Sequence, residues 1–169
     1  MKTPELVIRL DDIPPEGLEI VLNIDPERLR ALVAAEGQTP PAIRTPLTGD
    51  LKVTRSDQRL TLRGSFQVGV EISCDRCLND TATVVSGRVD ESLLLAEPGR
   101  SGALGDEDEE TESLTAENGQ VNIAGLVAEY FWLAWPFRFI CRPDCAGLCP
   151  RCGADLNDGP CGCQNKRIN

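Results

Sequence analysis

The residues best suited to chemistry in this chain are its eight cysteines, six of which lie close together near the C-terminus. These six are Cys141, Cys145, Cys149, Cys152, Cys161 and Cys163. The segment that holds them is rich in Gly, Pro and Asp and contains little apolar material. Burial alone therefore cannot offset the entropy that the segment loses when it becomes ordered. A bound ion can supply that stabilisation, and four thiolates around tetrahedral zinc are a common arrangement.

Two cysteine pairs have the spacing of a zinc knuckle, in which two residues separate the metal ligands. Cys149-Pro-Arg-Cys152 is followed by Gly153, and Cys74-Asp-Arg-Cys77 stands at the end of a predicted strand. In the first knuckle the proline fixes φ early in the turn, and the glycine accepts the left-handed conformation that closes it. These pairs and the four further cysteines predict structural zinc, one or two ions per chain. The alternatives are a disulfide framework, free buried thiols and redox chemistry.

The sequence leaves the grouping of the cysteines open. The preferred partition forms two groups of four: Cys149, Cys152, Cys161 and Cys163, and Cys74, Cys77, Cys141 and Cys145. A rival partition joins the two knuckles around one ion, as in a zinc ribbon, and leaves Cys141 and Cys145 spare or on another ion. A single zinc ion with additional loose thiols is a third possibility. Either grouping that mixes upstream and C-terminal cysteines would fix the tail to the upstream sheet.

The composition indicates where such a protein works and what it binds. The start Lys2-Thr3-Pro4-Glu5 has no apolar signal segment, and no apolar run is long enough to span a bilayer. Eight cysteines without an export signal indicate a reducing compartment, so we expect a cytoplasmic protein. The net charge is −10, of which residues 97–120 contribute −7 through eight acidic residues and Arg100. This overall charge disfavours nucleic acid, so any contact with RNA must be local.

The elements that must position the cysteines are mainly predicted strands. Residues 6–10, 18–22 and much of 47–95 have strand patterns. From Leu60 to Cys74 apolar and polar residues alternate strictly, which indicates a long antiparallel strand with one buried face. Cys74 is at an even-numbered position, like the apolar residues of this stretch, so it is expected on the buried face of the strand.

Two helices complete the expected fold. Asp25-Pro26-Glu27 begins a short helix that ends at Gly37, and Asn122 caps a second helix over residues 123–133. We therefore predict an α+β fold: an antiparallel, twisted or barrel-like sheet with a few helices and a C-terminal zinc-knuckle tail. One domain would hold three segments. These are the sheet with one short helix over 1–96, a flexible acidic loop over 97–120, and a helix with the metal-binding tail, packed on the sheet, over 121–169.

Histidine and several common catalytic motifs are missing from the chain. Histidine is absent, which removes the commonest general base and the commonest catalytic zinc ligand. No P-loop, dinucleotide-binding or nucleophile-elbow motif occurs. Zinc sites with four cysteines are closed, whereas catalytic zinc keeps an open position. We therefore expect no enzyme and no small-molecule substrate. A nuclease or RNA-modifying enzyme would need a carboxylate site that the sequence does not display.

The cysteine motifs resemble those of the bacterial YceD proteins. The resemblance rests on Cys74-Asp-Arg-Cys77-Leu78, the acidic loop and the later helix, and the signature Gly147-Leu-Cys149-Pro-Arg-Cys152-Gly153. It extends from the first strand to Cys163. It implies a role in the accumulation of large-subunit (23S) ribosomal RNA, and hence in ribosome biogenesis, with a plastid branch in plants. It implies no known enzymatic activity.

On this resemblance we expect a ribosome-biogenesis factor with structural zinc whose partner is ribosomal RNA or a large-subunit ribosomal protein. Five basic residues are candidate nucleic-acid contacts: Lys52, Arg59, Arg63, Arg76 and Arg151. Parity places the first three on the sheet face opposite the leucines, if the strands around residues 51–54 and 59–63 form a hairpin. The alternatives are a redox-sensing zinc and thiolate protein and a zinc-stabilised adaptor between proteins.

Overall fold

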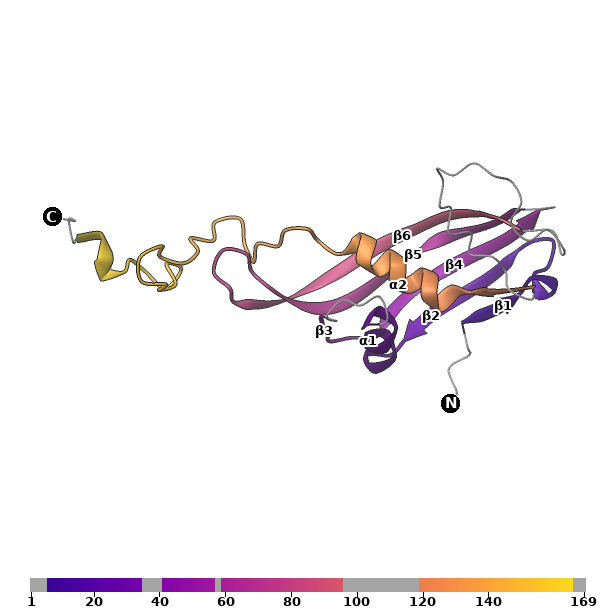
Figure 1. The fold of residues 1–169 in the computed structure, drawn as a ribbon, viewed down its shortest axis with the longest axis horizontal. Helices are drawn as coiled ribbons and strands as arrows, with labels where there is room; N and C mark the ends of the chain where they lie inside the picture. The colour runs from indigo at the N-terminus through magenta and orange to yellow at the C-terminus, as the bar shows by residue number, and fades with distance from the viewer. Residues whose placement is uncertain (1–5, 35–40, 57–58, 96–118, 166–169) are drawn as a thin grey trace, which may run out of the picture.

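A five-stranded antiparallel sheet forms the centre of the computed structural model, which describes residues 6–34, 41–56, 59–95 and 119–165 (Figure 1). Its strands are β2 (Leu18–Ile24), β3 (Ala42–Ile43), β4 (Leu47–Ser56), β5 (Arg59–Ser73) and β6 (Asp80–Leu94). The helices are α1 (Pro26–Ala34) and α2 (Ile123–Ala134), with short 3-10 turns at η1 (Leu10–Asp12) and η3 (Gly162–Asn165). A second, two-stranded sheet pairs β1 (Val7–Arg9) with β7 (Gln120–Asn122).

The long β5–β6 hairpin organises the main sheet. β6 pairs with β5 along its whole length, from Arg59 opposite Leu94 to Ser73 opposite Asp80. The other edge of β5 pairs with β4 and then with β3, and β2 pairs with β4. No pairing between described strands closes the sheet into a barrel, so the barrel-like part of the prediction is not confirmed. The turn over residues 74–79, which carries the upstream knuckle, therefore lies at the tip of the hairpin.

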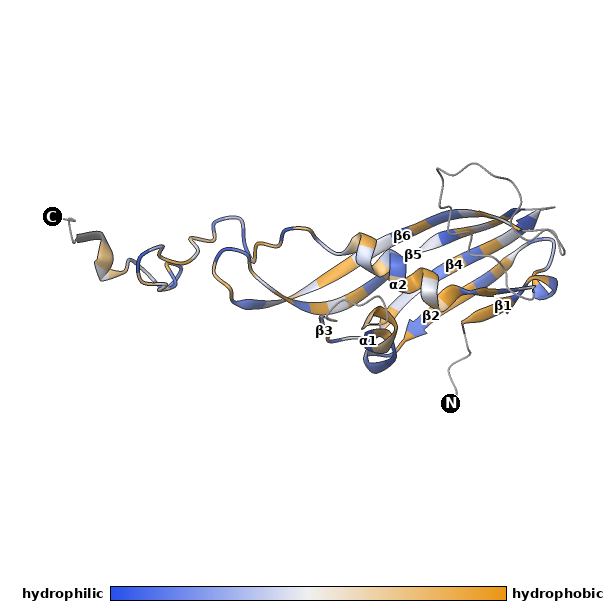
Figure 2. Cartoon of the chain, in the orientation of Figure 1, coloured by the Kyte–Doolittle hydropathy of each residue, from blue (hydrophilic) through white to orange (hydrophobic). Residues whose placement is uncertain are grey.

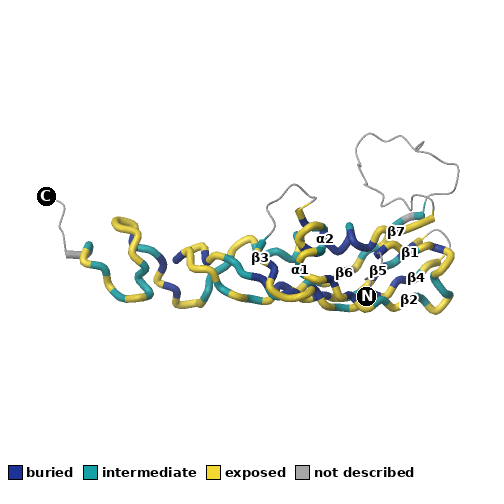
Figure 3. Tube along the Cα trace, turned by 90° about the horizontal axis from the view of Figure 1, so that it is seen from below, coloured by how far each residue is buried: buried dark blue, intermediate teal, exposed yellow. Residues whose placement is uncertain are grey.

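The alternation predicted from Leu60 onward is confirmed as one buried and one exposed face. Leu60, Leu62 and Phe66 are buried, while Arg63 and Gln67 between them are exposed. Figure 2 shows the same stripes of hydrophobic and hydrophilic residues along β4, β5 and β6. Figure 3 shows that the buried residues lie mainly between the sheet and the helices, whereas the tail is mostly exposed or half-buried. The sheet thus has one face in the core and one face in water.

Both predicted helix caps are present. The Asp25 side chain accepts a hydrogen bond from the Arg28 amide (2.9 Å), and the Asn122 side chain accepts from the amides of Ala124 and Gly125 (3.1 and 3.3 Å). These bonds satisfy amide groups that have no partner within the helix. The predicted end of the first helix at Gly37 lies outside the described residues.

The aromatic residues of α2 belong to the packing between the helices. Phe131 is fully buried, and its ring lies 5.4 Å from that of Trp132 and 5.6 Å from that of Trp135. The Trp132 indole N–H donates to the carbonyl oxygen of Val33 in α1 (3.2 Å). The cluster therefore fixes α2 to α1 over the sheet, as expected for core residues.

Two strands were not predicted, one residue of the predicted acidic loop needs a correction, and most of that loop falls outside the structure. β3 and β7 were not predicted, because two or three residues carry no readable periodicity. Gln120, assigned to the acidic loop, instead begins β7, since it pairs with Arg9. The rest of the predicted loop, apart from Gly119, lies outside the described residues. Within the described ranges no helix has the length and apolar character needed to cross a membrane.

Gly64 gives a test of the close approach between β4 and β5. A Cβ atom at this position would lie 2.0 Å from the carbonyl oxygen of Asp50. We expect Gly64→Ala to lower the free energy of unfolding by roughly 2 kcal/mol or more, because the backbone of the paired strand must move. Chemical denaturation would measure the change.

Gly125→Ala is the matched control, because a Cβ atom there meets nothing nearer than the Asn122 side chain at 3.8 Å. In the first turn of α2 alanine should be neutral or stabilising by up to about 1 kcal/mol. Equal unfolding midpoints for the two variants would contradict the tight approach of the strands.

Candidate metal centres

The eight sulfur atoms gather in two groups of four. The proximal group, at the hairpin tip, is Cys74, Cys77, Cys141 and Cys145; the distal group, further along the tail, is Cys149, Cys152, Cys161 and Cys163. Within each group all Sγ atoms lie within 4.8 Å of one another. This is the partition preferred from the sequence. The rival that joins both knuckles on one ion does not match these groups.

The sulfur separations in the proximal group fit a tetrahedral metal ion. The Sγ atoms of Cys74 and Cys145 are 3.9 Å apart, and those of Cys77 and Cys141 are 3.8 Å apart. Four thiolates held about 2.3 Å from zinc at tetrahedral angles are about 3.8 Å from one another. A disulfide would need about 2.0 Å. All eight cysteines are free thiols, and their separations suit a shared metal ion rather than disulfide bonds.

The two knuckles, Cys74–Asn79 and Cys149–Ala154, share one backbone conformation. In each, the amide of the first cysteine donates to the carbonyl oxygen five residues later (2.9 and 2.8 Å). The amide four residues later donates back to the carbonyl oxygen of that cysteine (2.8 and 2.9 Å). The residue after the second cysteine has positive φ in both cases: 61° at Leu78 and 71° at Gly153. The left-handed position predicted for the glycine is confirmed, and leucine occupies the equivalent position in the other knuckle.

An arginine precedes the second cysteine of each knuckle and donates a hydrogen bond to a backbone carbonyl oxygen of the same cysteine group. Arg76 donates from its guanidinium group to the carbonyl oxygen of Cys145 (3.0 Å), and Arg151 donates to that of Cys163 (3.2 Å). In both cases the acceptor belongs to a cysteine of the same group that comes from another part of the chain. Each arginine therefore ties its knuckle to the segment that completes the group.

Hydrogen bonds and crowding push the thiol pKa values in opposite directions. The amide of Cys141, with further backbone donors, lowers the pKa of Cys74 to about 6. The amides of Arg151 and Cys152 lower the pKa of Cys149 to about 6. Burial raises the pKa of Cys141 to about 12, and the neighbouring Cys152 side chain raises that of Cys163 to about 12. Each group thus favours one thiolate and resists four, so a cation is what would let all four ionise.

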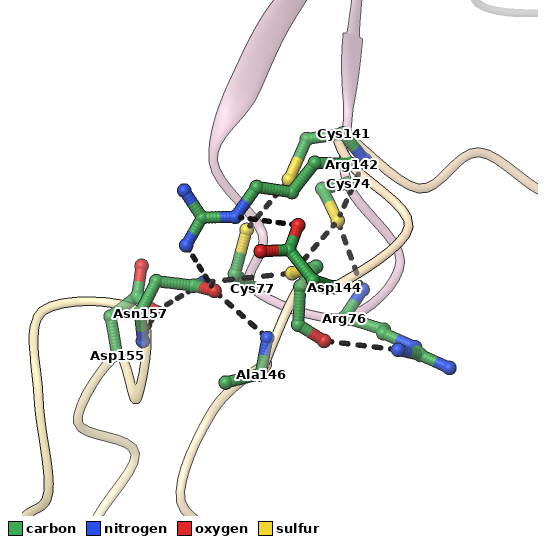
Figure 4. A network of polar contacts seen from close by, with 10 residues as sticks. Cys74, Arg76, Cys77, Cys141, Arg142, Asp144, Ala146, Asp155 and Asn157 are labelled. Carbon is green, nitrogen blue, oxygen red and sulfur yellow. Dashed lines mark hydrogen bonds and ion pairs between the residues drawn. The ribbon is translucent and has the colours of Figure 1, made fainter.

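Asn157 and Asp155 link the tail to the proximal group, as Figure 4 shows. The side-chain oxygen of Asn157 accepts hydrogen bonds from the Ala146 amide and from the Arg142 guanidinium group (both 2.8 Å). Its side-chain amide donates to Asp155 (2.7 Å) and lies 3.5 Å from the Cys145 sulfur. The Asn157 backbone amide also bonds Asp155 and, as the main cause, lowers the pKa of this carboxyl. The network orients one ligand through a neutral amide.

The same network reaches the hairpin tip, because Asn79 donates to the second Asp155 oxygen (2.8 Å). Sequence reasoning missed these residues. Their only signal is the pair of short polar side chains two positions apart in Asp155-Leu-Asn157, a spacing typical of local side-chain to backbone hydrogen bonds.

Backbone contacts also join the tail to the tip. The Asp75 amide donates to the carbonyl oxygen of Phe139 (2.9 Å), and the Phe139 amide donates to the Asp75 carboxylate (2.8 Å). The Leu148 amide donates to the carbonyl oxygen of Arg76 (3.0 Å). Gly147 allows this approach, since a Cβ atom there would lie 3.0 Å from the same oxygen. The hairpin tip and the tail, which each supply two cysteines of the proximal group, are therefore also joined by these hydrogen bonds.

The predicted basic residues of the sheet lie where parity placed them. Lys52 and Arg63 are cross-strand neighbours on the exposed face. However, Arg63 pairs with Asp90 (2.9 Å), and the other cross-strand neighbour of Lys52 is Glu19. Arg59 donates to the Ser92 hydroxyl (3.2 Å). This face is therefore mixed in charge rather than a basic stripe, and its role in nucleic-acid binding stays a prediction.

Comparisons with known proteins agree with the resemblance noted from the motifs. A family model described as "Large ribosomal RNA subunit accumulation protein YceD" matches residues 62–169, more than half of the chain. An uncharacterized protein of Mycobacterium tuberculosis is 32% identical over 113 residues, which cover 66% of this chain and 52% of the relative. An uncharacterized Mycobacterium leprae protein is 26% identical over 152 residues, covering 81% and 67%.

A plant protein is also similar. The Zea mays protein named "Large ribosomal RNA subunit accumulation protein YCED homolog 1, chloroplastic" is 26% identical over 151 residues, covering 74% of this chain and 51% of the relative. The chain thus spans about half the length of the M. tuberculosis and maize relatives. No solved structure matches the chain.

Leu78 allows a test of the shared knuckle conformation. A left-handed backbone costs a side chain such as leucine about 1–2 kcal/mol, and the Leu78 side chain is 64% exposed, so it packs little in return. We expect Leu78→Gly to leave stability unchanged or to raise it by up to ~1 kcal/mol, after the greater freedom of glycine in the unfolded chain is included. Thermal unfolding of the metal-loaded protein would measure this.

The reciprocal variant Gly153→Leu should lose about 1–2 kcal/mol, because nothing lies within 4 Å of the added Cβ atom and only the backbone conformation opposes it. A clear loss of stability in Leu78→Gly would show instead that the leucine packs against the tip.

Proposed function

The chain belongs to the YceD family of large ribosomal RNA subunit accumulation proteins, and on this premise we propose that it is a non-enzymatic ribosome-biogenesis factor of the cytoplasm. It promotes the accumulation of large-subunit (23S) ribosomal RNA through contacts with that RNA or with a large-subunit ribosomal protein. The observation that carries the proposal is the pair of four-cysteine groups that shape the tail. Four thiolates fill a tetrahedral ion, so these groups suit a binding surface and leave no open position for catalysis.

Each group holds a structural zinc ion in this proposal. The donor set is soft and all-thiolate, which selects zinc among the common divalent ions of a reducing compartment. The proximal group fits by its sulfur separations and by the amides that point at Cys74 (3.4 Å from both Arg76 and Cys141). The ion would supply the cohesion that the apolar-poor tail lacks.

The RNA contact is placed at the knuckle end of the molecule. On the sheet, Arg63 is already paired and acids flank the basic side chains, so little net positive charge faces a phosphate backbone. At the hairpin tip Arg76 is exposed, and one of its guanidinium nitrogens donates to the backbone carbonyl oxygen of Cys145. Its other N–H groups suit phosphate oxygens. Arg151 repeats this position in the distal knuckle.

A zinc-stabilised adaptor between proteins is the second candidate function. Large apolar side chains are exposed at the tip, at the end of α2 and after it: Leu78 (64%), Leu133 (71%) and Phe137 (107%). Exposed residues of this kind suit a protein surface better than a phosphate backbone. Identification of the molecules that copurify with the chain separates the two candidates.

The first prediction concerns metal content. Protein purified under reducing conditions should contain two zinc ions per chain by elemental analysis. Cys77→Ser and Cys152→Ser should each lose one ion, since each removes a ligand from a different group. Acidification should release the metal, because thiolate ligands must be deprotonated. Ser73→Ala, next to the first knuckle, is the control and should keep both ions. Wild-type protein without metal would refute the zinc proposal.

The second prediction concerns function in cells. Loss of the protein should lower the ratio of large-subunit to small-subunit ribosomal RNA, and the wild-type chain should restore it. Arg76→Gln with Arg151→Gln should restore it poorly. Because both arginines also bond cysteine carbonyl oxygens, elemental analysis of the variant separates a lost RNA contact from a lost metal ion. In vitro the same pair should weaken binding of the isolated RNA and flatten its salt dependence by roughly one unit of slope per lost phosphate contact.

Replacement of Lys52, Arg59 and Arg63 together by Glu is the comparison, and it should have the smaller effect on RNA affinity. If the sheet variant instead loses more RNA affinity than the knuckle variant, the RNA contact lies on the sheet. An unchanged ribosomal RNA ratio in cells that lack the protein would refute the proposed function.

A further inference from the structure

The outer edge of β6 is fifteen residues long and is not paired by any strand that the structure describes. β6 pairs with β5 on one side, from Asp80 to Leu94. Among the described residues no strand pairs with its other side and no loop makes a backbone hydrogen bond to it. The Tyr130 hydroxyl of α2 donates to one β6 carbonyl oxygen, that of Asp90 (3.4 Å). A row of unpaired amides and carbonyls is a template for another strand.

The stretch 81–87 of this edge lacks the features that usually prevent pairing. Residues 81–87, Thr-Ala-Thr-Val-Val-Ser-Gly, contain no charge and no proline, and the ladder with β5 runs through them without a bulge. Proteins commonly protect an edge with lysine, proline, a bulge or a covering loop. Val84 on the exposed face is 62% accessible, because its neighbour on β5 is Gly69, which has no side chain to cover it.

We propose that two copies of this chain associate through their β6 edges, antiparallel about a two-fold axis at Val84. Opposed residues of an antiparallel pair point to the same side of the sheet, so residues of equal parity must face each other. In this register Val84 meets the partner's Val84, and Ala82 meets the partner's Ser86. Asp80 then lies opposite the partner's Arg88. The two five-stranded sheets become one continuous sheet.

The charges of β6 favour this register. Asp80 and Arg88 are both on the exposed face, four positions on either side of Val84. A two-fold axis at Val84 therefore places Asp80 of each copy opposite Arg88 of the other. Neither Arg88 nor Asp80 makes an ion pair with any described residue, although one Asp80 oxygen accepts a hydrogen bond from the Ser73 hydroxyl. The neighbour of Arg88 on β5 is the neutral Ser65. On the buried side Thr83 would face the partner's Val85, which continues the apolar row. Opposite charges directly across strands stabilise pairing.

Other registers fit less well. An axis at Val89 would bring Arg88 to the partner's Asp90, but that carboxylate already binds Arg63 at 2.9 Å. An axis at Val85 would oppose Asp80 to the partner's Asp90, so like charges would repel.

The other free edge of the sheet, β2, is a weaker candidate. It is a seven-residue strand, and an axis at Val21 would oppose Glu19 to the neutral Asn23. The edge of β6 is therefore the self-complementary one.

Sedimentation equilibrium of the full metal-loaded chain tests the proposal. We expect the wild type to form dimers, and Asp80→Arg and Arg88→Asp each to weaken dimerisation roughly 10-fold or more, because each variant opposes like charges twice. The double variant should recover the wild-type dissociation constant. Val84→Lys, on the exposed face, should also disrupt the dimer, since two ammonium groups would meet at the axis. Glu19→Arg on β2 is the control and should change nothing.

The proposal is overturned if the wild type stays monomeric up to high micromolar concentration. It is also overturned if the two single charge variants dimerise normally, if the double variant shows no recovery, or if Glu19→Arg alone disrupts the dimer. Metal content by elemental analysis should stay at the wild-type value in every variant. Failure of the dimer therefore leaves the proposed function untouched, and the reverse also holds.

Discussion

The junction between the β5–β6 hairpin tip and the cysteine-rich tail is the contact on which the rest of the tail depends. The tail has too few apolar residues to fold by burial. Its backbone meets the tip at Asp75 and Arg76, and the proximal group takes two sulfur ligands from each side of the junction. Half-buried Ile140 and Leu148 are the small apolar cover of this cluster. A metal ion bound by the four sulfur atoms would stabilise the tail, as burial of the apolar row stabilises the sheet.

The sheet contributes by aiming the ligands. Because the side chains of β5 alternate between two faces, the same parity that buries Leu60 and Phe66 carries Cys74 to the buried side at the end of the strand. A register shift by one residue would turn this sulfur toward water. The continuous ladder between β5 and β6 prevents such a shift, and it also brings Cys77 back across the tip. The geometry of the proximal group is therefore a consequence of the strand pairing that ends beside it, at Ser73 and Asp80.

Much of this arrangement was predictable from local pattern, and the exceptions share a cause. The alternation from Leu60, the caps at Asp25 and Asn122, and the preferred cysteine partition all rest on spacing within short stretches. The mixed charge of the sheet face was missed, because Asp90 reaches Arg63 through a strand register that no local pattern specifies. The Asn157 network was missed for the same reason. Its partners come from separate turns, and hydrogen bonds between turns leave no periodic trace.

The two groups also differ in how their ligands are spread along the chain, and this sets an order of assembly. The distal ligands fall between Cys149 and Cys163, so a metal ion there would close only short loops. In the proximal group Cys77 and Cys141 are 64 residues apart. The entropy of closing so long a loop must be met by the packing of α2 on the sheet and by the backbone bonds between tail and tip. On the proposal that both groups bind metal, the distal group would need only its own segment to bind an ion, whereas the proximal group would need the sheet as well. Metal in the proximal site would thus mark a chain that has finished folding.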